Sequence, residues 1–231
     1  MDPLVIQEQG HFFTGITEHT GPAGTSVYGT HVQWQSPPSV RDNLVLVHGG
    51  GGQALDMLAT PDGRPGWATL FLRDGFAVYT VDRPGMGRSP YHPDIYGPYG
   101  PPATYEGFVA TFAGPSPQGL PEHTQWPGGG DRDDPALATF LAWQEPFPGS
   151  LARAHEDMRA GAAGLLARIG PSVLLTHARR GVRVAGRRRP ARAGQGDRRG
   201  GAGRGAVHEA PRARGVHVRA DSGAGVVRSG R

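Results

Sequence analysis

The sequence contains no cysteine and no lysine, and no apolar run approaches the roughly 20 residues that a membrane-spanning helix needs. The absence of cysteine excludes a disulfide framework and a thiol nucleophile. The first residues, Met1–Glu8, have neither a basic segment nor an apolar stretch of signal-peptide length, so the chain as written is expected to be cytoplasmic. Export stays open for complete relatives. The 231 residues are enough for one domain with a sizeable core.

Charge is unevenly distributed along the chain, because every basic residue is arginine and most arginines come late. Residues 1–177 hold 9 Arg and 17 Asp or Glu, a net charge of −8, whereas residues 178–231 hold 15 Arg and 3 acids, a net charge of +12. The total of +4 therefore hides two unlike parts. Such asymmetry is typical of a basic tail that binds nucleic acid or a membrane surface, although a second explanation is developed below.

The pattern of apolar residues before position 178 predicts alternating strands and helices. Two β-rich runs around the turn at residues 21–24 predict an antiparallel hairpin. Continuous apolar runs predict buried parallel strands at 43–47, 76–81 and 172–176, and helical spacing of Trp67, Leu70 and Phe71 predicts a helix between the first two. Ser150 is a good cap for a helix that runs to Gly170. This alternation predicts an α/β fold around a mostly parallel sheet with flanking helices.

Residues 84–150 break the alternation, because they are rich in proline, glycine and aromatic residues. A short helix is expected around 134–143, within a loop-rich, lid-like insertion at one edge of the sheet. Three acids in this insertion are potential metal ligands, yet no histidine cluster accompanies them in the sequence, so a solvated loop is expected: Asp131, Asp133 and Asp134.

The run of four glycines after the first buried strand is the first motif with chemical content. His48-Gly49-Gly50-Gly51-Gly52 follows Leu44–Val47 directly. Glycine is needed where backbone N–H groups must approach a substrate oxygen without a Cβ atom in the way. Alternatively, the segment is a glycine-rich turn without a ligand.

A second motif follows the next strand, about thirty residues later. It is Asp82-Arg83-Pro84-Gly85-Met86-Gly87-Arg88-Ser89. A phosphate cradle would need a glycine loop that opens directly into a helix, preferably with a lysine. Pro90 and Pro93 follow here and the chain has no lysine, which disfavours that alternative.

In this order and spacing, the two motifs resemble those of α/β-hydrolases, in particular bacterial esterases with a His-Gly-Gly-Gly oxyanion turn. The resemblance covers about residues 10–177. It implies that Gly49, Gly50 and Gly51 form the oxyanion hole and that His48 and His177 shape the pocket. A structural turn is implied for Asp82, Gly85, Gly87 and Ser89. No metal and no cofactor are implied.

The nucleophile elbow that the resemblance requires is missing. It should follow strand 172–176, but the chain continues His177-Ala178-Arg179-Arg180-Gly181, with Ala178 at the position where the family has its serine. The acid and the histidine of a triad come later still in this fold. The fold is therefore expected to be truncated after the nucleophile strand, and no catalytic residue is intact.

Residues 178–231 change character at the same point. Their only sizeable apolar side chains are seven valines, whose burial cannot offset about 1–2 kcal/mol per residue of backbone ordering, so a disordered Arg/Gly-rich tail is expected. A shifted reading frame explains both changes, because permitted codons for 194–202, read with one base dropped, give Val-Lys-Ala-Ile-Val-Ala-Val-Glu. The alternative is a genuine tail that binds nucleic acid, but such tails usually carry lysine or interleaved aromatics.

The sequence therefore predicts a serine-hydrolase lineage that cleaves carboxylic esters through an acyl-enzyme. The substrate of complete relatives is expected to be a small-molecule ester, with no membrane and no nucleic acid involved. This chain is expected to be inactive, and unstable because its sheet would end unpaired at the last strand. The alternative function is that of a non-catalytic protein whose arginine-rich tail binds nucleic acid.

Overall fold

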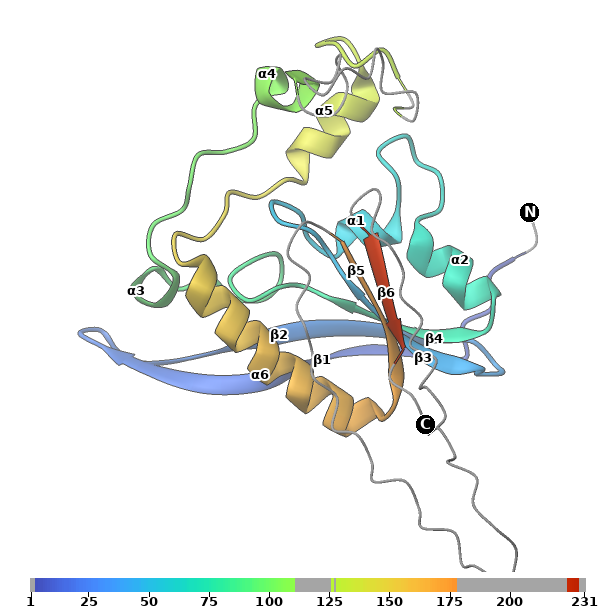
Figure 1. Ribbon diagram of the computed structural model, residues 1–231, viewed down its shortest axis with the longest axis horizontal. Helices are drawn as coiled ribbons and strands as arrows, with labels where there is room; N and C mark the ends of the chain where they lie inside the picture. Colours follow the sequence, from blue (N-terminus) through green and yellow to red (C-terminus); the bar gives the residue numbers. More distant parts are fainter. Residues whose placement is uncertain (1–2, 111–125, 127, 178–223, 229–231) are drawn as a thin grey trace, which may run out of the picture.

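The computed structural model describes residues 3–110, 126, 128–177 and 224–228 of the chain. These residues form a six-stranded mixed sheet in the order β1-β2-β4-β3-β5-β6, with helices on both faces (Figure 1). The predicted α/β fold is confirmed. None of the described helices is both long and apolar enough to cross a bilayer.

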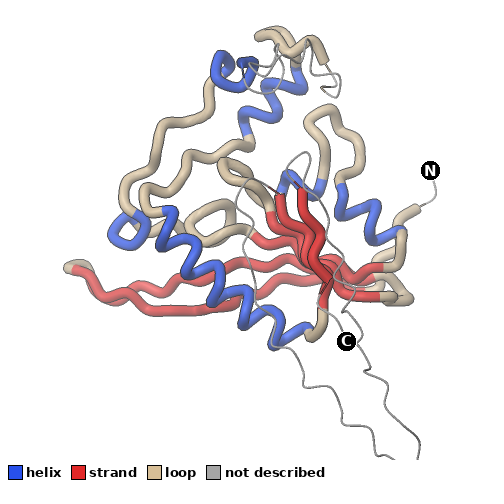
Figure 2. Tube along the Cα trace, viewed as in Figure 1, coloured by secondary structure: helices blue, strands red, loops and turns tan. Residues whose placement is uncertain are grey.

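Strands β1 (Glu8–Gly21) and β2 (Gly24–Ser36) form the predicted antiparallel hairpin, which is longer than the β-rich runs suggested. Gly21 pairs with Gly24, so the turn consists of two residues. The pairing is interrupted by a register shift between Thr14 and Thr17, beside Gly15, whose φ is +60°. The hairpin extends well beyond the rest of the sheet (Figure 2).

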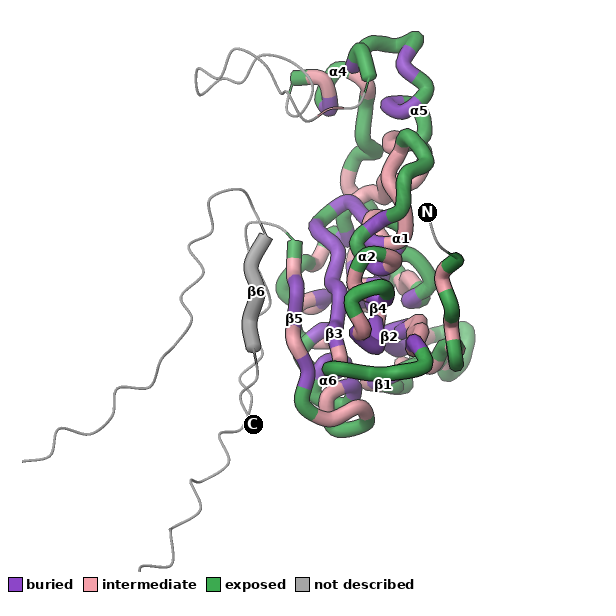
Figure 3. The backbone as a smooth tube through the Cα atoms, turned by 90° about the vertical axis from the view of Figure 1, so that its right-hand side faces the viewer, coloured by how far each residue is buried: buried purple, intermediate pink, exposed green. Residues whose placement is uncertain are grey.

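The centre of the sheet is parallel, as predicted. Strand β3 (Asp42–Val47) lies between β4 (Phe76–Val81) and β5 (Ser172–His177) and pairs in parallel with both. Leu44 and Leu46 belong to the core on one face, and Val45 and Val47 belong to the core on the other. Because side chains alternate between faces, burial on both sides explains why this strand is apolar without interruption. Figure 3 shows the buried residues gathered along β3 and β4.

Helices α1 (Leu55–Leu58) and α2 (Trp67–Arg73) cover one face. The spacing of Trp67, Leu70 and Phe71 predicted α2, but not its buried side. Ala68 and Leu72 are buried, whereas Trp67 and Leu70 are 42% and 52% exposed. The seven-residue helix thus packs on the core through Ala68 and Leu72, with Phe71 partly buried beside them, and not through Trp67 and Leu70.

Helix α6 (Leu151–Ile169) covers the other face and crosses the hairpin. Ser150 caps it as predicted, its hydroxyl accepting a hydrogen bond from the Arg153 amide at 3.3 Å. Its buried stripe includes Met158 and Leu165, which pack on Val32 and the β3 valines.

The described part of the insertion at 84–150 includes the short helices α3 (Pro93–Tyr96), α4 (Tyr105–Phe108) and α5 (Pro135–Ala142). Helix α5 confirms the helix expected around 134–143. Figure 1 shows α4 and α5 well away from the sheet, beyond the edge where α1 lies. They share a small aromatic cluster: Phe108, Trp126, Phe140 and Trp143.

Strand β6 (Ala224–Arg228) corrects one expectation. It pairs antiparallel with β5, from Val173 against Arg228 to His177 against Ala224, so the sheet does not end unpaired at 172–177. The sequence Ala-Gly-Val-Val-Arg has two β-branched residues, and an open strand edge offers backbone groups that any extended segment can satisfy. The rest of the predicted disordered tail lies outside the described residues.

Candidate active site

The two glycine motifs and His177 meet at one edge of the sheet. Val47 is in register with Val81 on one side and with Thr176 on the other. The residues that follow these three strands, His48, Asp82 and His177, therefore emerge side by side at the carboxyl ends of the parallel strands. This edge is where open α/β sheets bind ligands.

The turn at His48–Gly52, here called the oxyanion turn, needs glycine for three different reasons. A Cβ atom on Gly50 would lie 2.3 Å from Cε1 of Phe147. Gly51 has a φ of +75°, in the left-handed region that side chains disfavour. A Cβ atom on Gly52 would lie 1.8 Å from the Asp56 carboxylate. The turn is thus packed from two sides, by the insertion and by α1.

The amide groups of this turn are available for a ligand. Among the hydrogen bonds of the described residues, none is donated by the four backbone amides from Gly49 to Gly52. The carbonyl of Gly51, by contrast, accepts a hydrogen bond from the Glu145 amide at 2.7 Å. Binding of a developing oxyanion requires free N–H groups in a fixed position. Here the amides are free, while the hydrogen bond to the Gly51 carbonyl holds the turn in place.

His48 links the oxyanion turn to the next motif and is fully occupied in doing so. Its Nε2 accepts a hydrogen bond from the Arg83 amide at 2.9 Å, so Nδ1 carries the proton and donates it to the Gly49 carbonyl at 2.7 Å. Burial lowers the pKa of His48 to about 4. The ring is neutral at pH 7 with no free lone pair, so it cannot serve as a general base.

The turn at Asp82–Ser89, here called the Asp82 turn, is held by its own polar groups. Buried Asp82 accepts hydrogen bonds from the Ala54 amide and from Nε of Arg88, each at 2.7 Å. The Ser89 hydroxyl donates to the Asp82 carbonyl at 2.7 Å and accepts from the His31 amide at 2.8 Å. In addition, Nδ1 of His31 lies 3.3 Å from the Asp82 carboxylate.

The two glycines predicted in the Asp82 turn both have positive φ, +77° for Gly85 and +55° for Gly87. A Cβ atom on Gly87 would lie 2.5 Å from the Asp82 carboxylate, and one on Gly85 would lie 3.0 Å from the Tyr96 ring. Both positions therefore require glycine for local geometry, and the chain reverses tightly there.

The insertion returns across the site, which the sequence did not indicate. The Glu145 carboxylate accepts a hydrogen bond from the Gly87 amide at 2.8 Å, while the Glu145 amide bonds to Gly51. Phe147, which is 47% exposed, lies against Gly50. One short segment thus bridges both turns. No local pattern could have revealed it, because these partners are 58 to about 100 positions apart in the chain.

Asp56, from α1, is a second residue that the sequence did not single out. Its carboxylate lies against Gly52, and Oδ1 is buried without a hydrogen-bond partner among the described residues. Burial raises its pKa to about 7, and the negative charges of Asp82 and Glu145 act in the same direction. A carboxyl group that is half protonated near pH 7 therefore lies next to the oxyanion turn.

His177 lies at the exposed end of β5, and its charge contributes to lowering the pKa of His48. Ala178, the position where the nucleophile is expected, lies outside the described residues. Among the described residues, His177 is the last of β5 and directly follows Thr176, which is in register with Val47, the residue before the oxyanion turn.

One of the three acids expected in a solvated loop proves to be structural. Asp134 is 5% exposed and caps α5, accepting hydrogen bonds from the Ala136 amide at 2.8 Å and from the indole of Trp126 at 2.7 Å. The expectation of a solvated side chain was wrong here, because Asp is also a favoured residue at a helix N-terminus.

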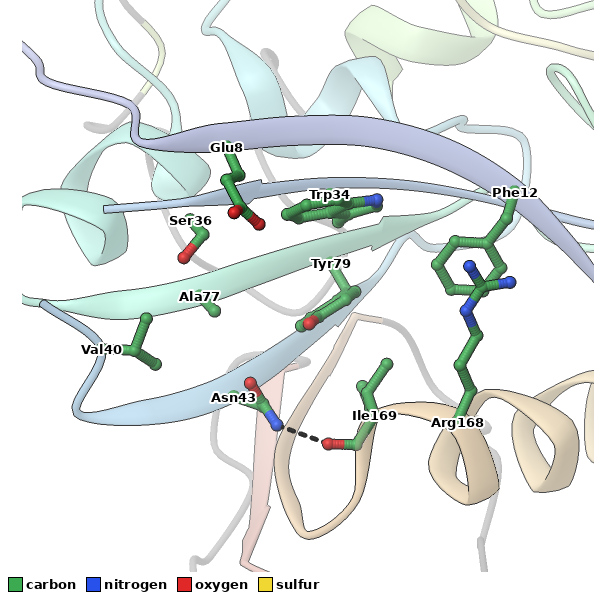
Figure 4. A pocket seen from close by; sticks show the side chains of 10 residues that line it. All are labelled: Glu8, Phe12, Trp34, Ser36, Val40, Asn43, Ala77, Tyr79, Arg168 and Ile169. Carbon is green, nitrogen blue, oxygen red and sulfur yellow. Dashed lines mark hydrogen bonds between the residues drawn. The ribbon is translucent and has the colours of Figure 1, made fainter. Parts of the chain in front are cut away.

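The groove that the structure shows most clearly is not at this site. It has a volume of about 400 Å³ and lies at the opposite, amino ends of β3 and β4 (Figure 4). Stacked Trp34 and Tyr79 line it, together with Arg168, whose guanidinium lies 3.8 Å from the centre of the Phe12 ring. The carboxyl edge carries the motifs, so we assign the candidate active site there.

Comparison with known proteins shows which class of protein the chain resembles. The chain is 36% identical over 150 residues to a fungal protein (Fungal sp., strain ATCC 74256) named probable secreted lipase phiG, covering 60% of this chain and 38% of the relative. A solved structure described as that of a novel bacterial esterase superposes with a TM-score of 0.62 at 27% identity, over 77% of this chain and 62% of the esterase. No family model matches the chain.

The fold and the comparisons agree on the class. Over the matched part, the chain resembles esterases and lipases of the α/β-hydrolase type, and it has their fold. It spans less than two thirds of either protein.

Proposed function

We propose that this chain carries the oxyanion half of a carboxylic-ester hydrolase that works through an acyl-enzyme, and that it is inactive as it stands. The observation behind this proposal is the register of the three strand ends. In this register the end of β3 lies next to the end of β5, and the four glycine amides that follow β3 donate no hydrogen bond to a described residue. This supports an oxyanion hole next to the position where the family has its serine. The fungal relative's name, with the words secreted and lipase, and the bacterial esterase support the reaction class.

The proposed division of labour follows from the contacts. The amides of Gly49, Gly50 and Gly51 would donate to the oxygen of a tetrahedral intermediate, while His48 holds the turn through its two ring nitrogens. His177 would line the pocket, and the Asp82 turn would support both from below. No metal and no cofactor is needed for these steps.

Inactivity is part of the proposal because position 178 is alanine. Loss of the nucleophile leaves a residual acceleration of about 10³–10⁴-fold over water, from the oxyanion hole and binding alone. We attribute the loss to a reading frame that shifts near Ala178, which makes the arginine-rich tail an accident of translation.

The test compares this chain with a chain translated in the alternative frame after His177. The coding DNA around codon 178 is sequenced, both proteins are purified, and each is assayed with p-nitrophenyl esters and a fluorophosphonate probe. We expect labelling and turnover from the alternative-frame chain alone, at a kcat of about 1–10³ s⁻¹. Its matched control has alanine restored at the elbow and should neither label nor turn over.

Each part of the proposal can fail separately. Esterase-level turnover by the 231-residue chain would refute its inactivity. An alternative-frame chain that folds but does not label would refute the ester-hydrolase assignment. The remaining alternative is a binding protein with a basic tail, and salt-dependent retention of a compact protein on nucleic acid would favour it. A location is proposed only for a complete protein, namely export, as in the relative's name.

A further inference from the structure

The tip of the β1–β2 hairpin brings two histidines and an aspartate together, away from the candidate active site. His19 lies near the end of β1, His92 lies just before α3, and Asp94 lies in the first turn of α3. One ring nitrogen of each histidine and a carboxylate oxygen of Asp94 all lie within 4.8 Å of one another. Segments more than 70 positions apart thus converge on three metal-ligating groups.

The protonation state of His92 follows from its neighbour Ser26. The Ser26 hydroxyl donates its only hydrogen to the His19 carbonyl at 3.3 Å. In that arrangement its oxygen, 2.8 Å from Nε2 of His92, accepts a hydrogen bond from that nitrogen. This leaves Nδ1 of His92 with a lone pair, and Nδ1 is buried with no hydrogen-bond partner in the described structure. A buried lone pair without a donor is costly unless a proton or a cation occupies it.

The remaining geometry is compatible with coordination of one ion. Nε2 of His19 lies 3.9 Å from Oδ2 of Asp94, and the rings of His19 and His92 meet edge to face, with centroids 4.8 Å apart. Zinc takes nitrogen and oxygen ligands at roughly 2.0–2.2 Å, so tetrahedral ligands lie about 3.3 Å apart. The ligand atoms would have to approach one another by about 0.6 to 1.5 Å, through rotation of the three side chains.

The donor set selects the kind of cation. Two imidazoles and one carboxylate suit borderline ions such as Zn²⁺, Co²⁺ or Ni²⁺, whereas Mg²⁺ and Ca²⁺ prefer oxygen ligands alone. The hydrogen bond from His92 to Ser26 also has the form that commonly fixes the ring of a metal-bound histidine. Asp94 is 58% exposed in its side chain, so water can complete the coordination.

We propose that His19, His92 and Asp94 form a binding site for a divalent d-block cation of the zinc class, which clamps the hairpin tip to α3. The clamp would also restrain residues that do not contact the ion. Helix α3 carries Tyr96, whose ring packs on Gly85 of the Asp82 turn and whose hydroxyl donates to Asp157 of α6 at 3.0 Å. The ion would thus tie the outermost part of the hairpin to the support of the candidate active site.

The test measures binding of Zn²⁺ to the purified full chain by calorimetry and by the shift of its thermal midpoint, with Co²⁺ absorption as a spectroscopic readout. We expect one tight site, a rise in Tm with Zn²⁺ and no rise with Mg²⁺. His92→Ala and Asp94→Asn should each weaken Zn²⁺ affinity at least tenfold and abolish the visible Co²⁺ bands. His11→Ala removes another β1 histidine and should leave affinity unchanged.

Two further variants separate this site from other causes. Ser26→Ala keeps all three ligands but removes the bond that orients His92, so a loss of about threefold to tenfold in affinity is expected. His208→Ala with His217→Ala removes two late histidines and should change nothing. Zn²⁺ affinity that survives His92→Ala, or that falls only in the late-histidine variant, would overturn the proposal. A chain that binds no Zn²⁺ would also overturn it and would leave a contact between His19 and Asp94 beside an edge-to-face pair of histidine rings. The proposal is independent of the ester-hydrolase assignment.

Discussion

Two glycine-rich turns end neighbouring parallel strands, and they differ in what their polar groups do. In the Asp82 turn, the carboxylate, the Ser89 hydroxyl and the His31 amide bond to one another or to nearby backbone. In the oxyanion turn, the glycine amides donate to no described residue, and the adjacent Asp56 has a buried oxygen without a partner. Similar composition therefore produces one turn whose carboxylate and hydroxyl are hydrogen-bonded, although Nδ1 of the neighbouring His31 has no hydrogen-bond partner among the described residues, and one turn whose glycine amides are free for a ligand.

The difference between the two turns indicates which of them is the better candidate for binding a ligand. A satisfied polar network stabilises a fold, whereas unsatisfied polar groups in a packed region are costly and are retained where a ligand will pair with them. The predictions below test whether the two turns divide stability and chemistry in this way.

The largest effect is expected for Asp82→Ala. It removes the acceptor of the buried Ala54 amide and the ion-pair partner of the half-exposed Arg88, which keeps its bond to Gln33, at a cost of about 3 kcal/mol in the free energy of unfolding. Urea denaturation measures the loss. Asp74→Ala, which breaks an exposed ion pair with Arg41, should cost less than about 1 kcal/mol. Equal losses in the two variants would erase the contrast.

A pH dependence should mark the oxyanion turn. The folded pKa of Asp56, about 7, lies above its usual value of 3.8, so the folded protein binds a proton that the unfolded chain releases. This carboxyl therefore costs no stability below pH 4, and the free energy of unfolding falls as pH rises from about 4 to about 7. We expect a loss of roughly 2–3 kcal/mol, measured by denaturation at each pH.

Asp56→Asn is the matched variant, because it has the same shape and does not ionise. It should remove the Asp56 contribution, so that between pH 4 and pH 7 the free energy of unfolding no longer falls with rising pH and keeps only the rise from His48. The buried His48 changes the free energy of unfolding in the opposite direction, because its contribution increases as pH rises from about 4 to 6.5. Its pKa is about 4, below its usual 6.5, so its share of stability is complete above pH 6.5 and declines towards pH 4. An unchanged profile in Asp56→Asn would mean that another group carries the dependence.

Ser89→Ala should come next in size. The change leaves the His31 amide and the Asp82 carbonyl unpaired in a buried position, at a cost of about 2 kcal/mol. Ser36→Ala, where the hydroxyl makes one local bond at the surface, should stay within about 0.5 kcal/mol. If both variants unfold at the same urea concentration, the Asp82 turn does not depend on its internal network.

The smallest effect on stability is expected for Gly50→Ala, at about 1 kcal/mol. The new methyl group meets the Phe147 ring, but that ring is half exposed and belongs to a loop that can give way. Phe147→Ala should remove most of the penalty in the double variant, so a double-mutant cycle by thermal unfolding checks the contact. Additive effects would show that Phe147 and Gly50 do not interact.

Much of the fold could be predicted from the sequence, because local pattern and burial coincide in its core. The run at 43–47 is apolar throughout since β3 is buried on both faces, and Ser150 marks the start of α6 through its own hydroxyl. The buried side of α2 could not be predicted, because the spacing of Trp67 and Leu70 is helical too, and packing against the core decides which side is buried.

Which chemical groups follow the central strands can be read from the sequence alone. Four glycines after β3 provide amides without side chains, and alanine at position 178 provides no nucleophile, whatever the fold does. Only the tertiary structure decided which groups meet. It placed Glu145 and Phe147 on the oxyanion turn, left an oxygen of Asp56 unpaired, and joined His19 to His92 and Asp94. These contacts join segments that are distant in the chain. Local sequence patterns indicate helices, strands and turns, whereas the packing of those elements determines which distant residues meet.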